Sequence, residues 1–227
     1  MQSTLDSFFK TKQNTTAQHS SDQQDVSQME DPIHLSDRSF IYLGQLPASV
    51  VPDMEKLLAL RPDEPDTVVI AGREIATPRF VAHYLRSYQY TGRLHPAGSL
   101  PDLLEPLLAY ANSTLMPCPD DPTKKYNQVL VNFYMHGGHY IGKHSDDERQ
   151  LVPNSTVFSA SFGQERIFRI RMKKGGTVVK DIPMLHGSYI VMCGDMQKGY
   201  THEVPKVTGK RGDSLGPRVN VTFRVFS

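Results

Sequence analysis

The spacing of hydrophobic residues changes along the chain, and this change predicts an α+β fold. Between residues 126 and 227, apolar and polar side chains alternate in short runs that glycine and proline separate. A period of two is typical of strands that bury one face, and many short strands without helices between them indicate a sandwich, a jelly roll or a barrel. The runs are QVLVNFY, VFSASFG, ERIFRIRM, GSYIVMCG and PRVNVTFRVF.

The region before residue 126 carries helical signals as well as strand signals. Apolar residues that follow Pro52 predict a short amphipathic helix. A longer apolar stripe at 103–115 predicts a second helix, in which Pro106 either introduces a kink or marks the first turn. Between these helices, the segment TVVIAGREI predicts a β-hairpin that turns at Ala71 and Gly72.

The N-terminal part of the chain is too polar to form a core. Residues 11–30 contain only two sizeable apolar side chains, so burial would not offset the entropy lost on ordering. We therefore expect a disordered tail, with the core beginning near Phe40. This divides the chain into a tail (1–38), an N-terminal extension (39–125) and a β-rich core (126–227).

Composition excludes several classes of protein. Of the 227 residues, 38% are hydrophobic and 22% are charged, a soluble globular profile, and no run approaches the roughly eighteen apolar residues of a membrane span. Two cysteines exclude a disulfide framework and a four-thiolate zinc site. The net charge is +1, but residues 164–227 hold 12 Lys/Arg against 5 Asp/Glu. This basic segment is either a phosphate-attracting surface or a solvated face.

A histidine and an aspartate form a candidate metal site. His144 and Asp146 are two residues apart, so on a strand both side chains would leave the same face. With His202 as third ligand they would form the two-histidine, one-carboxylate triad of non-haem Fe(II) oxygenases. Alternatives are a hydrogen-bonded core histidine at 144, or a zinc site made of His136, His139 and His144, although no single period aligns those three.

The C-terminal run alternates without a fault and predicts a pocket for an anion. Its polar face carries Arg218, Asn220, Thr222 and Arg224. On an interior strand, two guanidinium groups need an anionic partner; the alternative is an edge strand with this face in water. Asn132 and Tyr134 share a face on a second predicted strand. An Fe(II) site beside such a pocket describes a 2-oxoglutarate oxygenase, in which we expect Arg224 to bind the far carboxylate and O2 to take a remaining metal position.

These residues resemble the AlkB-type nucleic-acid dealkylases, particularly the eukaryotic nuclear members that act on DNA. The shared motifs are N-x-Y at 132–134, H-x-D-D-E-R at 144–149, S-F-G at 161–163, the distal His202 and R-V-N-V-T-F-R at 218–224. The resemblance implies a double-stranded β-helix (a jelly-roll, cupin-like core) behind a hairpin nucleotide-recognition lid. It also implies oxidative demethylation of 1-methyladenine and 3-methylcytosine, with the methyl carbon leaving as formaldehyde.

The resemblance assigns roles to particular residues. Iron would be bound by His144, Asp146 and His202, and 2-oxoglutarate by Asn132, Tyr134, Arg218, Asn220 and Arg224. Glu148 would contact the flipped base and Tyr90 would stack on it, since a methyl group in a duplex is out of reach. Without the resemblance, a core aromatic would be the simpler interpretation of Tyr90.

One departure from the family concerns the tip of the predicted hairpin. Duplex-acting relatives carry a bulky wedge there, whereas this chain has Ala71 and Gly72. Alanine would fill little of the gap left by an extruded base, so we expect a preference for alkylated single-stranded DNA over duplex DNA. The basic run that includes Arg166 and Arg169 is the expected backbone-contacting surface, against the alternative of a solvated face.

The first residues carry a second motif. Gln2, Leu5, Phe8 and Phe9 fit Q-x-x-L-x-x-F-F, which resembles the PCNA-interacting peptide (PIP box) that binds the sliding clamp. Alternatives are an amphipathic turn that docks on the protein's own core and an organelle presequence, which the acidic residues disfavour. The motif predicts a nuclear protein, and we expect a monomer without membrane association.

Two other functional interpretations remain at this point. The enzyme could act on RNA or on a protein side chain as a demethylase or hydroxylase of the same class. Alternatively, the jelly roll could be a non-catalytic damage-binding module tethered to the clamp, although the full set of triad and cosubstrate residues argues against this.

Overall fold

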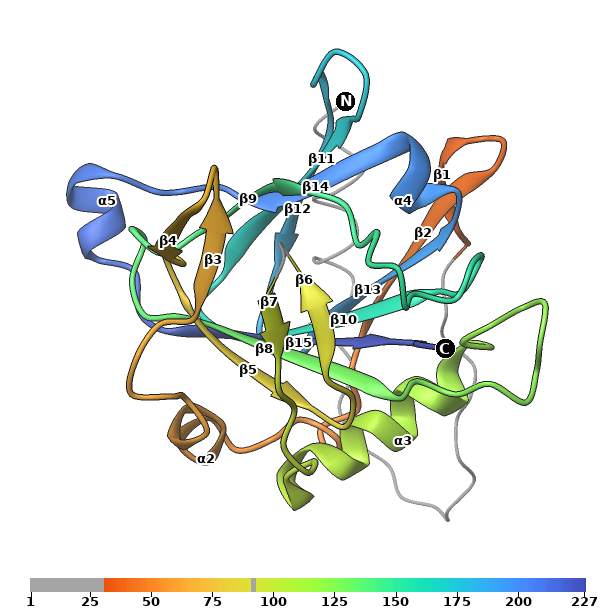
Figure 1. The fold of residues 1–227 in the computed structure, drawn as a ribbon, viewed down its shortest axis with the longest axis horizontal. Helices are drawn as coiled ribbons and strands as arrows, with labels where there is room; N and C mark the ends of the chain where they lie inside the picture. Colours follow the sequence, from red (N-terminus) through yellow and green to blue (C-terminus); the bar gives the residue numbers. More distant parts are fainter. Residues whose placement is uncertain (1–30, 91–92) are drawn as a thin grey trace, which may run out of the picture.

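Two antiparallel β-sheets form the framework of the protein. The computed structural model describes residues 31–90 and 93–227 (Figure 1). The larger sheet contains, in spatial order, β1 (Ile33–Ser36), β2 (Ser39–Gln45), β13 (Ser188–Gly194), β10 (Val157–Gly163), β15 (Arg218–Arg224), β8 (Gln128–Tyr134) and β5 (Phe80–Tyr84). The smaller sheet contains β12 (Val178–Met184), β11 (Arg166–Met172), β14 (Tyr200–Val204) and β9 (Ile141–His144).

The connections between the two sheets make a double-stranded β-helix. From β8 onward the chain passes repeatedly between the larger and the smaller sheet. Apart from the β1–β2 and β11–β12 hairpins, neighbouring strands within these two sheets are far apart in sequence. This is the jelly-roll arrangement that the period-two pattern predicts. The larger sheet extends beyond this core because β5 pairs with β8 on one side and β2 pairs with β13 on the other.

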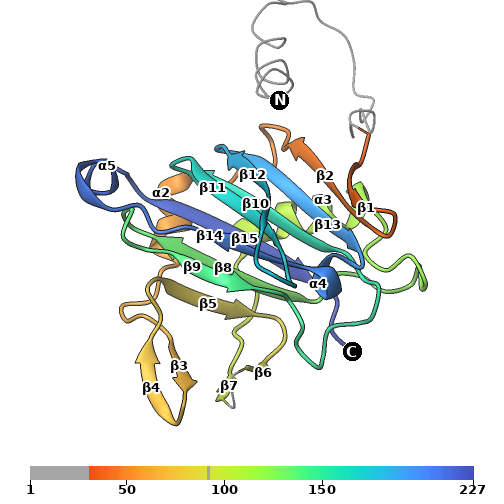
Figure 2. The same ribbon diagram turned by 90° about the horizontal axis from the view of Figure 1, so that it is seen from above.

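Two hairpins project from the sheet framework on the side of β5. They are β3–β4 (Thr67–Ile70 and Arg73–Ala76) and β6–β7 (Tyr88–Tyr90 and Arg93–His95). Figure 2 shows both on the same side of the molecule. The predicted turn at Ala71 and Gly72 is confirmed, and both residues have positive φ angles, 50° and 76°. Successive left-handed residues are typical of the tight turns that match the twist of a hairpin.

Helices cover the outer face of the larger sheet. They are α2 (Met54–Ala59) and α3 (Glu105–Thr114), the latter preceded by a 3₁₀ turn, η1 (Asp102–Leu104), while α4 (Met196–Gly199) and α5 (Gly209–Asp213) lie in loops. Asp53 caps α2 by accepting a hydrogen bond from the backbone N–H of Lys56 at 2.9 Å. Pro106 lies in the first turn of α3, where it costs no hydrogen bond.

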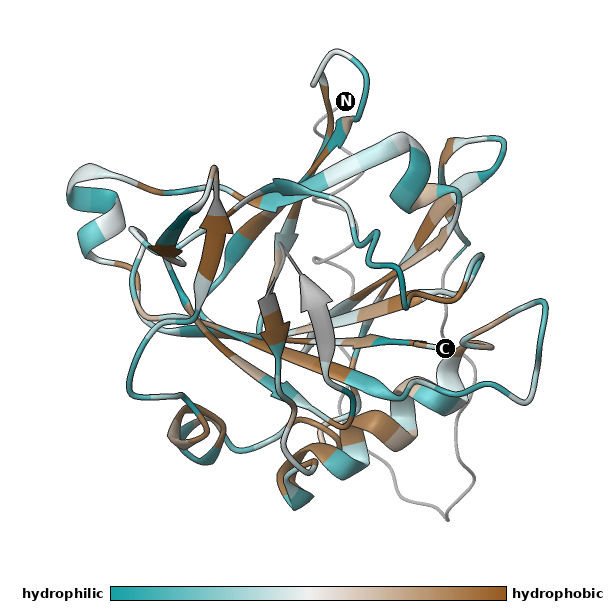
Figure 3. Ribbon diagram, in the orientation of Figure 1, coloured by the Kyte–Doolittle hydropathy of each residue, from teal (hydrophilic) through white to brown (hydrophobic). Residues whose placement is uncertain are grey.

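Most of the hydrophobic residues lie on the strands and on the inner sides of the helices (Figure 3). Leu107 and Ala111 of α3 belong to the main core cluster together with Phe158 of β10. Phe158 is fully buried and stacks on Tyr189 with a centroid separation of 4.8 Å. Within the described residues, no helix combines the length and the apolar character needed to cross a membrane.

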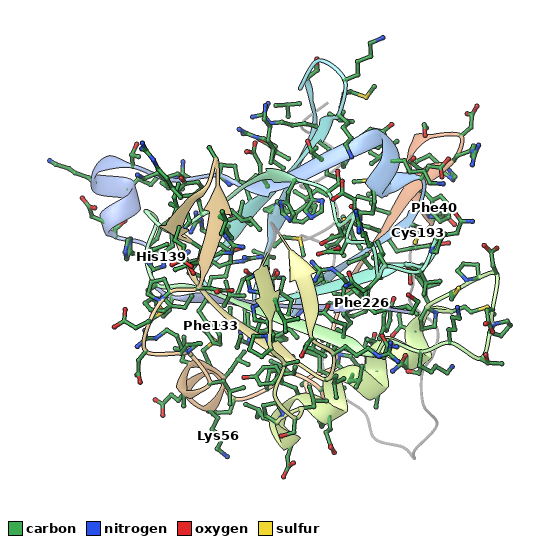
Figure 4. The ribbon with its side chains drawn as sticks, in the orientation of Figure 1. Phe40, Lys56, Phe133, His139, Cys193 and Phe226 are labelled. Carbon is green, nitrogen blue, oxygen red and sulfur yellow. The ribbon has the colours of Figure 1, made fainter. Side chains whose placement is uncertain are left out.

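Within the described residues, strand structure begins before the predicted start of the core. The expected tail runs to residue 38 with a core starting near Phe40, yet β1 begins at Ile33, and Ile33 and Leu35 pack against buried core residues. Their contribution is hidden in the sequence because β1 has only four residues. Phe40 of β2 lies opposite Cys193 of β13, and both are labelled in Figure 4. The stretch 11–30 and the motif at residues 2–9 lie outside the described residues.

Candidate metal and cosubstrate site

The candidate site lies between the inner faces of the two sheets. A cavity of about 30 Å³ there is lined by residues of β8 and β15 from the larger sheet and of β9 and β14 from the smaller sheet. It brings together the residues that the sequence predicts for the metal and for the cosubstrate, namely Asn132, Tyr134, His144, Asp146, His202, Arg218, Asn220 and Arg224. Segments more than eighty residues apart therefore form a single pocket.

Two histidines face each other across a pair of strands. His144 ends β9 and lies directly opposite His202 of β14, with ring centroids 4.3 Å apart. Asp146 follows the end of β9 by two residues, so the expectation that it shares a strand face with His144 is wrong. One ligand atom from each of the three residues lies within 4.8 Å of the others, and Oδ2 of Asp146 is 3.5 Å from Nε2 of His202.

Neighbouring groups hold the three side chains in a ligand-ready orientation. Nδ1 of His144 donates to the carbonyl of Gly142 at 2.9 Å, which leaves Nε2 available as a ligand. Phe168 stacks on His202 with ring centroids 5.1 Å apart. Oδ2 of Asp146 is buried and has no hydrogen-bond partner within the described structure. A cation would satisfy this oxygen, so the donor set fits a divalent metal ion.

The charge state of the three residues also suits a metal. Burial opposes ionisation of Asp146, but the nearby charges of Arg224, His202 and His144 outweigh it and lower its pKa to about 2. Burial, reinforced by His144, lowers the pKa of His202 to about 3. Burial likewise lowers the pKa of His144. One carboxylate and two neutral imidazoles therefore face one another at neutral pH, which is the form that binds metal.

The rival group of three histidines is not assembled. The rings of His136 and His139 lie 4.1 Å apart, but neither belongs to a metal-ligating group of three within residues 31–90 and 93–227. Nδ1 of His139 instead accepts a hydrogen bond from the backbone N–H of Met135 at 3.1 Å. The structure therefore favours His144 with Asp146 and His202.

β15 is an interior strand with two buried faces. It lies between β10 and β8, and all seven of its residues are buried, so the edge-strand alternative is wrong. The amide of Asn220 donates to Ser159 Oγ and to the carbonyl of Ala160, both at 2.8 Å. These contacts fix the floor of the pocket in one arrangement.

The two arginines of β15 have different surroundings. Arg218 is 1% exposed, donates to Ser161 Oγ at 2.8 Å and lies 5.1 Å from the centre of the Tyr134 ring. Its Nε and Nη1 atoms are buried and have no hydrogen-bond partner within the described structure. Arg224 instead donates to Asp146 Oδ1, and it lies 3.9 Å from Glu148. Arg218 thus presents two unengaged donors in the pocket, whereas the sequence suggested Arg224 for the far carboxylate.

The prediction that Arg166 and Arg169 form a basic surface is partly wrong. Arg166 is only 4% exposed, and it donates to the carbonyls of His139 at 2.9 Å and Pro205 at 2.7 Å. Arg169 forms a two-point ion pair with Asp181 at 2.7 and 2.6 Å. Arg166 therefore organises loops below the surface, and the charge of Arg169 is locally neutralised. Loop carbonyls from distant segments leave no local signal in the sequence, which is why Arg166 was misassigned.

Of the residues expected to recognise a base, Ala71, Gly72 and Tyr90 lie on the projecting hairpins, whereas Glu148 lies near Arg224 of the metal pocket. Ala71 and Gly72 form the β3–β4 tip, and a methyl group added at Gly72 would meet no atom within 4 Å. Tyr90 belongs to β6 and pairs with Arg93 of β7. The Glu148 side chain is 6% exposed, and burial raises its pKa.

Sequence reasoning missed Arg79, which orients a residue of the pocket lining. Nε of Arg79 donates to Oδ1 of Asn132 at 2.6 Å. Arg79 lies just before β5, a strand that lacks the period-two pattern. In the sequence, the role of Arg79 is indicated only by its position in the segment PRF, directly after the predicted hairpin. Asn132 is thereby oriented before any ligand binds.

Comparisons with known proteins agree with this geometry. Human DNA oxidative demethylase ALKBH2 is 39% identical over 106 residues, which are 44% of this chain and 39% of the relative. Mouse alpha-ketoglutarate-dependent dioxygenase alkB homolog 3 is 34% identical over 113 residues, which are 46% of this chain and 38% of the relative. The matched segments thus span about two fifths of the curated relatives' length. They confirm the resemblance to AlkB-type enzymes.

A solved structure and a family model extend the comparison over more of the chain. The structure of OsALKBH1 aligns with a TM-score of 0.53 and 17% identity, covering 81% of this chain and 97% of that one, which confirms the fold. The model of the 2OG-Fe(II) oxygenase superfamily matches residues 73–224, more than half of the chain, and so includes the triad and all of β15. The chain therefore belongs to the 2OG-Fe(II) oxygenase superfamily.

Proposed function

We propose that this protein is a DNA oxidative demethylase that repairs 1-methyladenine and 3-methylcytosine with Fe(II), 2-oxoglutarate and O2. The observation that carries the proposal is the single pocket in which a His–Asp–His triad faces a buried arginine strand. The curated relatives named as DNA oxidative demethylases support DNA as the substrate.

One set of pocket residues would bind iron and another would bind the cosubstrate. His144, Asp146 and His202 would hold Fe(II), which supplies the oxidising chemistry together with 2-oxoglutarate and O2. Arg218 would bind the far carboxylate of 2-oxoglutarate, since it has two unengaged buried donors. Arg224 holds the second oxygen of Asp146 and so keeps this carboxylate ionised and oriented. Asn132, Tyr134 and Asn220 complete the lining of the cosubstrate pocket.

The hairpins beside the pocket would receive the damaged base. Tyr90 would stack on the flipped base and Glu148 would contact its edge, because the methyl group must leave the helix to reach the metal. Ala71 at the β3–β4 tip is too small to replace an extruded base in a duplex. Single-stranded DNA, in which no partner base has to be displaced, is therefore the favoured substrate.

Formaldehyde release from defined oligonucleotides tests the proposal. Single-stranded and duplex DNA carrying 1-methyladenine or 3-methylcytosine would be compared with methylated RNA and a methylated peptide. We expect release from DNA, faster from single strands, and none with Asp146→Ala. Turnover of RNA or peptide alone would establish the alternative of another demethylase or hydroxylase of this class. An enzyme that consumes no 2-oxoglutarate with any substrate would favour the non-catalytic module.

We also propose that residues 2–9 bind the sliding clamp PCNA and bring the enzyme to replicating DNA in the nucleus. The proposal rests on the sequence QSTLDSFF, with Leu5, Phe8 and Phe9 as the apolar plug and Gln2 beside it. Wild-type protein should retain PCNA in a pull-down, and a variant with both Phe8→Ala and Phe9→Ala should lose it. Unchanged retention by the variant would show that the motif is fortuitous.

A further inference from the structure

A second His–Asp–His group lies beside the candidate active site and has no role in the proposed reaction. Asp66 directly precedes β3, His83 lies on β5 and His95 ends β7. Oδ2 of Asp66 is 3.1 Å from Nε2 of His83 and 2.9 Å from Nδ1 of His95. One carboxylate oxygen therefore faces two imidazole nitrogens. The three ligand atoms all lie within 4.8 Å of one another, as do those of His144, Asp146 and His202.

The group is largely shielded from solvent. The side chains of His83 and His95 are 9% and 4% exposed, and that of Asp66 is 19% exposed. The two rings lie 5.0 Å apart. Charged and polar groups of this kind are rarely buried together unless they pair with one another or with a metal ion. The burial therefore points to a built site and not to a chance surface cluster.

Backbone contacts fix the orientation of the carboxylate. Oδ1 of Asp66 accepts the N–H of Thr67 at 2.7 Å, so that Oδ2 is the oxygen presented to the imidazoles. The carbonyl of Asp66 also accepts the N–H of Thr77 at 2.7 Å, which closes the base of the β3–β4 hairpin. On the other side, the carbonyl of His83 accepts the N–H of Gly98 at 2.9 Å. Support of this kind is what metal ligands generally require.

We propose that Asp66, His83 and His95 bind a divalent transition-metal ion of the Zn²⁺ class. Two imidazoles and one carboxylate are ligands that zinc accepts, with a fourth position left for water. Bond lengths of about 2.0–2.1 Å and tetrahedral angles place neighbouring ligand atoms roughly 3.4 Å apart. The two separations from Asp66 Oδ2, 3.1 and 2.9 Å, need to open by only a few tenths of an ångström.

The charge state of the group supports cation binding. Burial is the largest influence on His83 and lowers its pKa, so its imidazole is neutral near pH 7. Burial opposes ionisation of Asp66, but hydrogen bonds from His83 and His95 outweigh it and hold the pKa of Asp66 well below its usual range. A fixed negative charge beside a neutral imidazole is the form in which such residues ligate metal.

A metal at this position would fasten both projecting hairpins to the framework. Asp66 belongs to the base of β3–β4, His95 to the end of β6–β7, and His83 to an edge strand of the larger sheet. Figure 2 shows that the two hairpins leave the same side of β5. His83 lies opposite Leu130, whose side chain lines the catalytic cavity. The ion would therefore fix the orientation of the two hairpins relative to the pocket.

Zinc retention by two matched proteins tests the proposal without relying on enzyme activity. Both carry His144→Ala and His202→Ala, which remove the iron-triad imidazoles, and one also carries His83→Gln and His95→Asn. Glutamine nitrogen can replace Nε2 and asparagine nitrogen can replace Nδ1, so hydrogen bonds to Asp66 are kept while the imidazole ligands are lost. Untagged, EDTA-treated full-length proteins would be loaded with Zn²⁺, passed through gel filtration and analysed for metal.

We expect one zinc per chain in the first protein and none in the second. Zinc should also raise the thermal midpoint of the first protein only, because an ion that binds the folded state stabilises it. His34→Ala in the first background removes an exposed histidine outside the group and should leave retention unchanged. Absence of zinc from the first protein, or equal retention by both, would overturn the proposal. Asp66→Asn gives a second isosteric test if the double replacement does not fold, and it should lower zinc affinity at least tenfold.

Discussion

Replacement of Arg218 by methionine should weaken 2-oxoglutarate binding without destabilising the ligand-free protein. Methionine has nearly the same length but no charge. In the structure Arg218 is 1% exposed, donates one hydrogen bond to Ser161 and lies against the face of Tyr134. Losing these contacts costs about 1 kcal/mol for the hydrogen bond and about 1–2 kcal/mol for the ring contact. Removing a buried charge with unengaged donors returns a comparable or larger amount.

The effect on the cosubstrate should be much larger. A buried carboxylate that loses its guanidinium partner loses roughly 2–5 kcal/mol of binding free energy. At about 1.4 kcal/mol per factor of ten, the dissociation constant of 2-oxoglutarate should rise roughly 30- to 3,000-fold. Isothermal titration of the Mn²⁺-loaded protein measures this change, since Mn²⁺ occupies such sites without oxidising the cosubstrate. Urea unfolding of the metal-free protein measures the change in stability.

Two results would refute this reasoning. Wild-type affinity in Arg218→Met would show that the far carboxylate binds elsewhere. A loss of more than about 2 kcal/mol in the free energy of unfolding would show that the buried guanidinium is not a net cost in the ligand-free state. Arg218→Lys is the matched control, because it keeps the charge but not the planar guanidinium. Its affinity for 2-oxoglutarate should lie between those of the wild-type protein and Arg218→Met.

Three further predictions follow from the metal site, the core and a buried thiol. Asp146→Ala should lower the Mn²⁺ stoichiometry in a titration by one ion per chain, because it removes the carboxylate of the triad; an unchanged stoichiometry would place this metal elsewhere. Phe158→Ala should lower the free energy of unfolding in urea by about 3–5 kcal/mol, since the ring is fully buried in the main core cluster, and a loss below 1 kcal/mol would contradict this packing. Burial raises the pKa of Cys193 to about 12, above its unfolded value of about 8.5. The protonated thiol of Cys193 therefore contributes its full stabilisation below pH 8.5, and the contribution falls as pH rises, by at most about 1.4 kcal/mol per pH unit. Cys193→Ala should reduce the decline in the free energy of unfolding between pH 8.5 and 9.5. An unchanged decline would contradict the raised pKa of Cys193.

The sequence predicts the parts of the fold where one physical signal dominates. β15 was predicted because its alternation is complete over seven residues, and its two arginines on one face indicated a buried anion pocket. α3 was predicted because helical spacing and Pro106 agree. The three triad residues were named from ligand chemistry, and the structure brings them into one pocket.

The remaining features depend on long-range contacts that leave no local pattern. β9 has only four residues, and the chain leaves its strand before Asp146, so strand periodicity gave the wrong reason for the proximity of Asp146 to His144. Arg166 is buried because loop carbonyls from distant segments surround it. The different surroundings of Arg218 and Arg224 arise because Arg224 lies within reach of Asp146, 78 positions earlier in the chain. The relations of Arg166 and Arg224 join segments far apart in the chain, so no local pattern records them.

The position of β15 has a consequence for how the protein is made. β15 joins β8 and β5 on one side to β10, β13, β2 and β1 on the other. A ribosome synthesises β15 after every other strand of the described chain, so both halves of the sheet exist before the strand that unites them. At about 5–20 residues per second, β8 and β10 would wait several seconds with open hydrogen-bonding edges. Such edges are templates for wrong pairing, so the nascent chain is most vulnerable to aggregation in this interval.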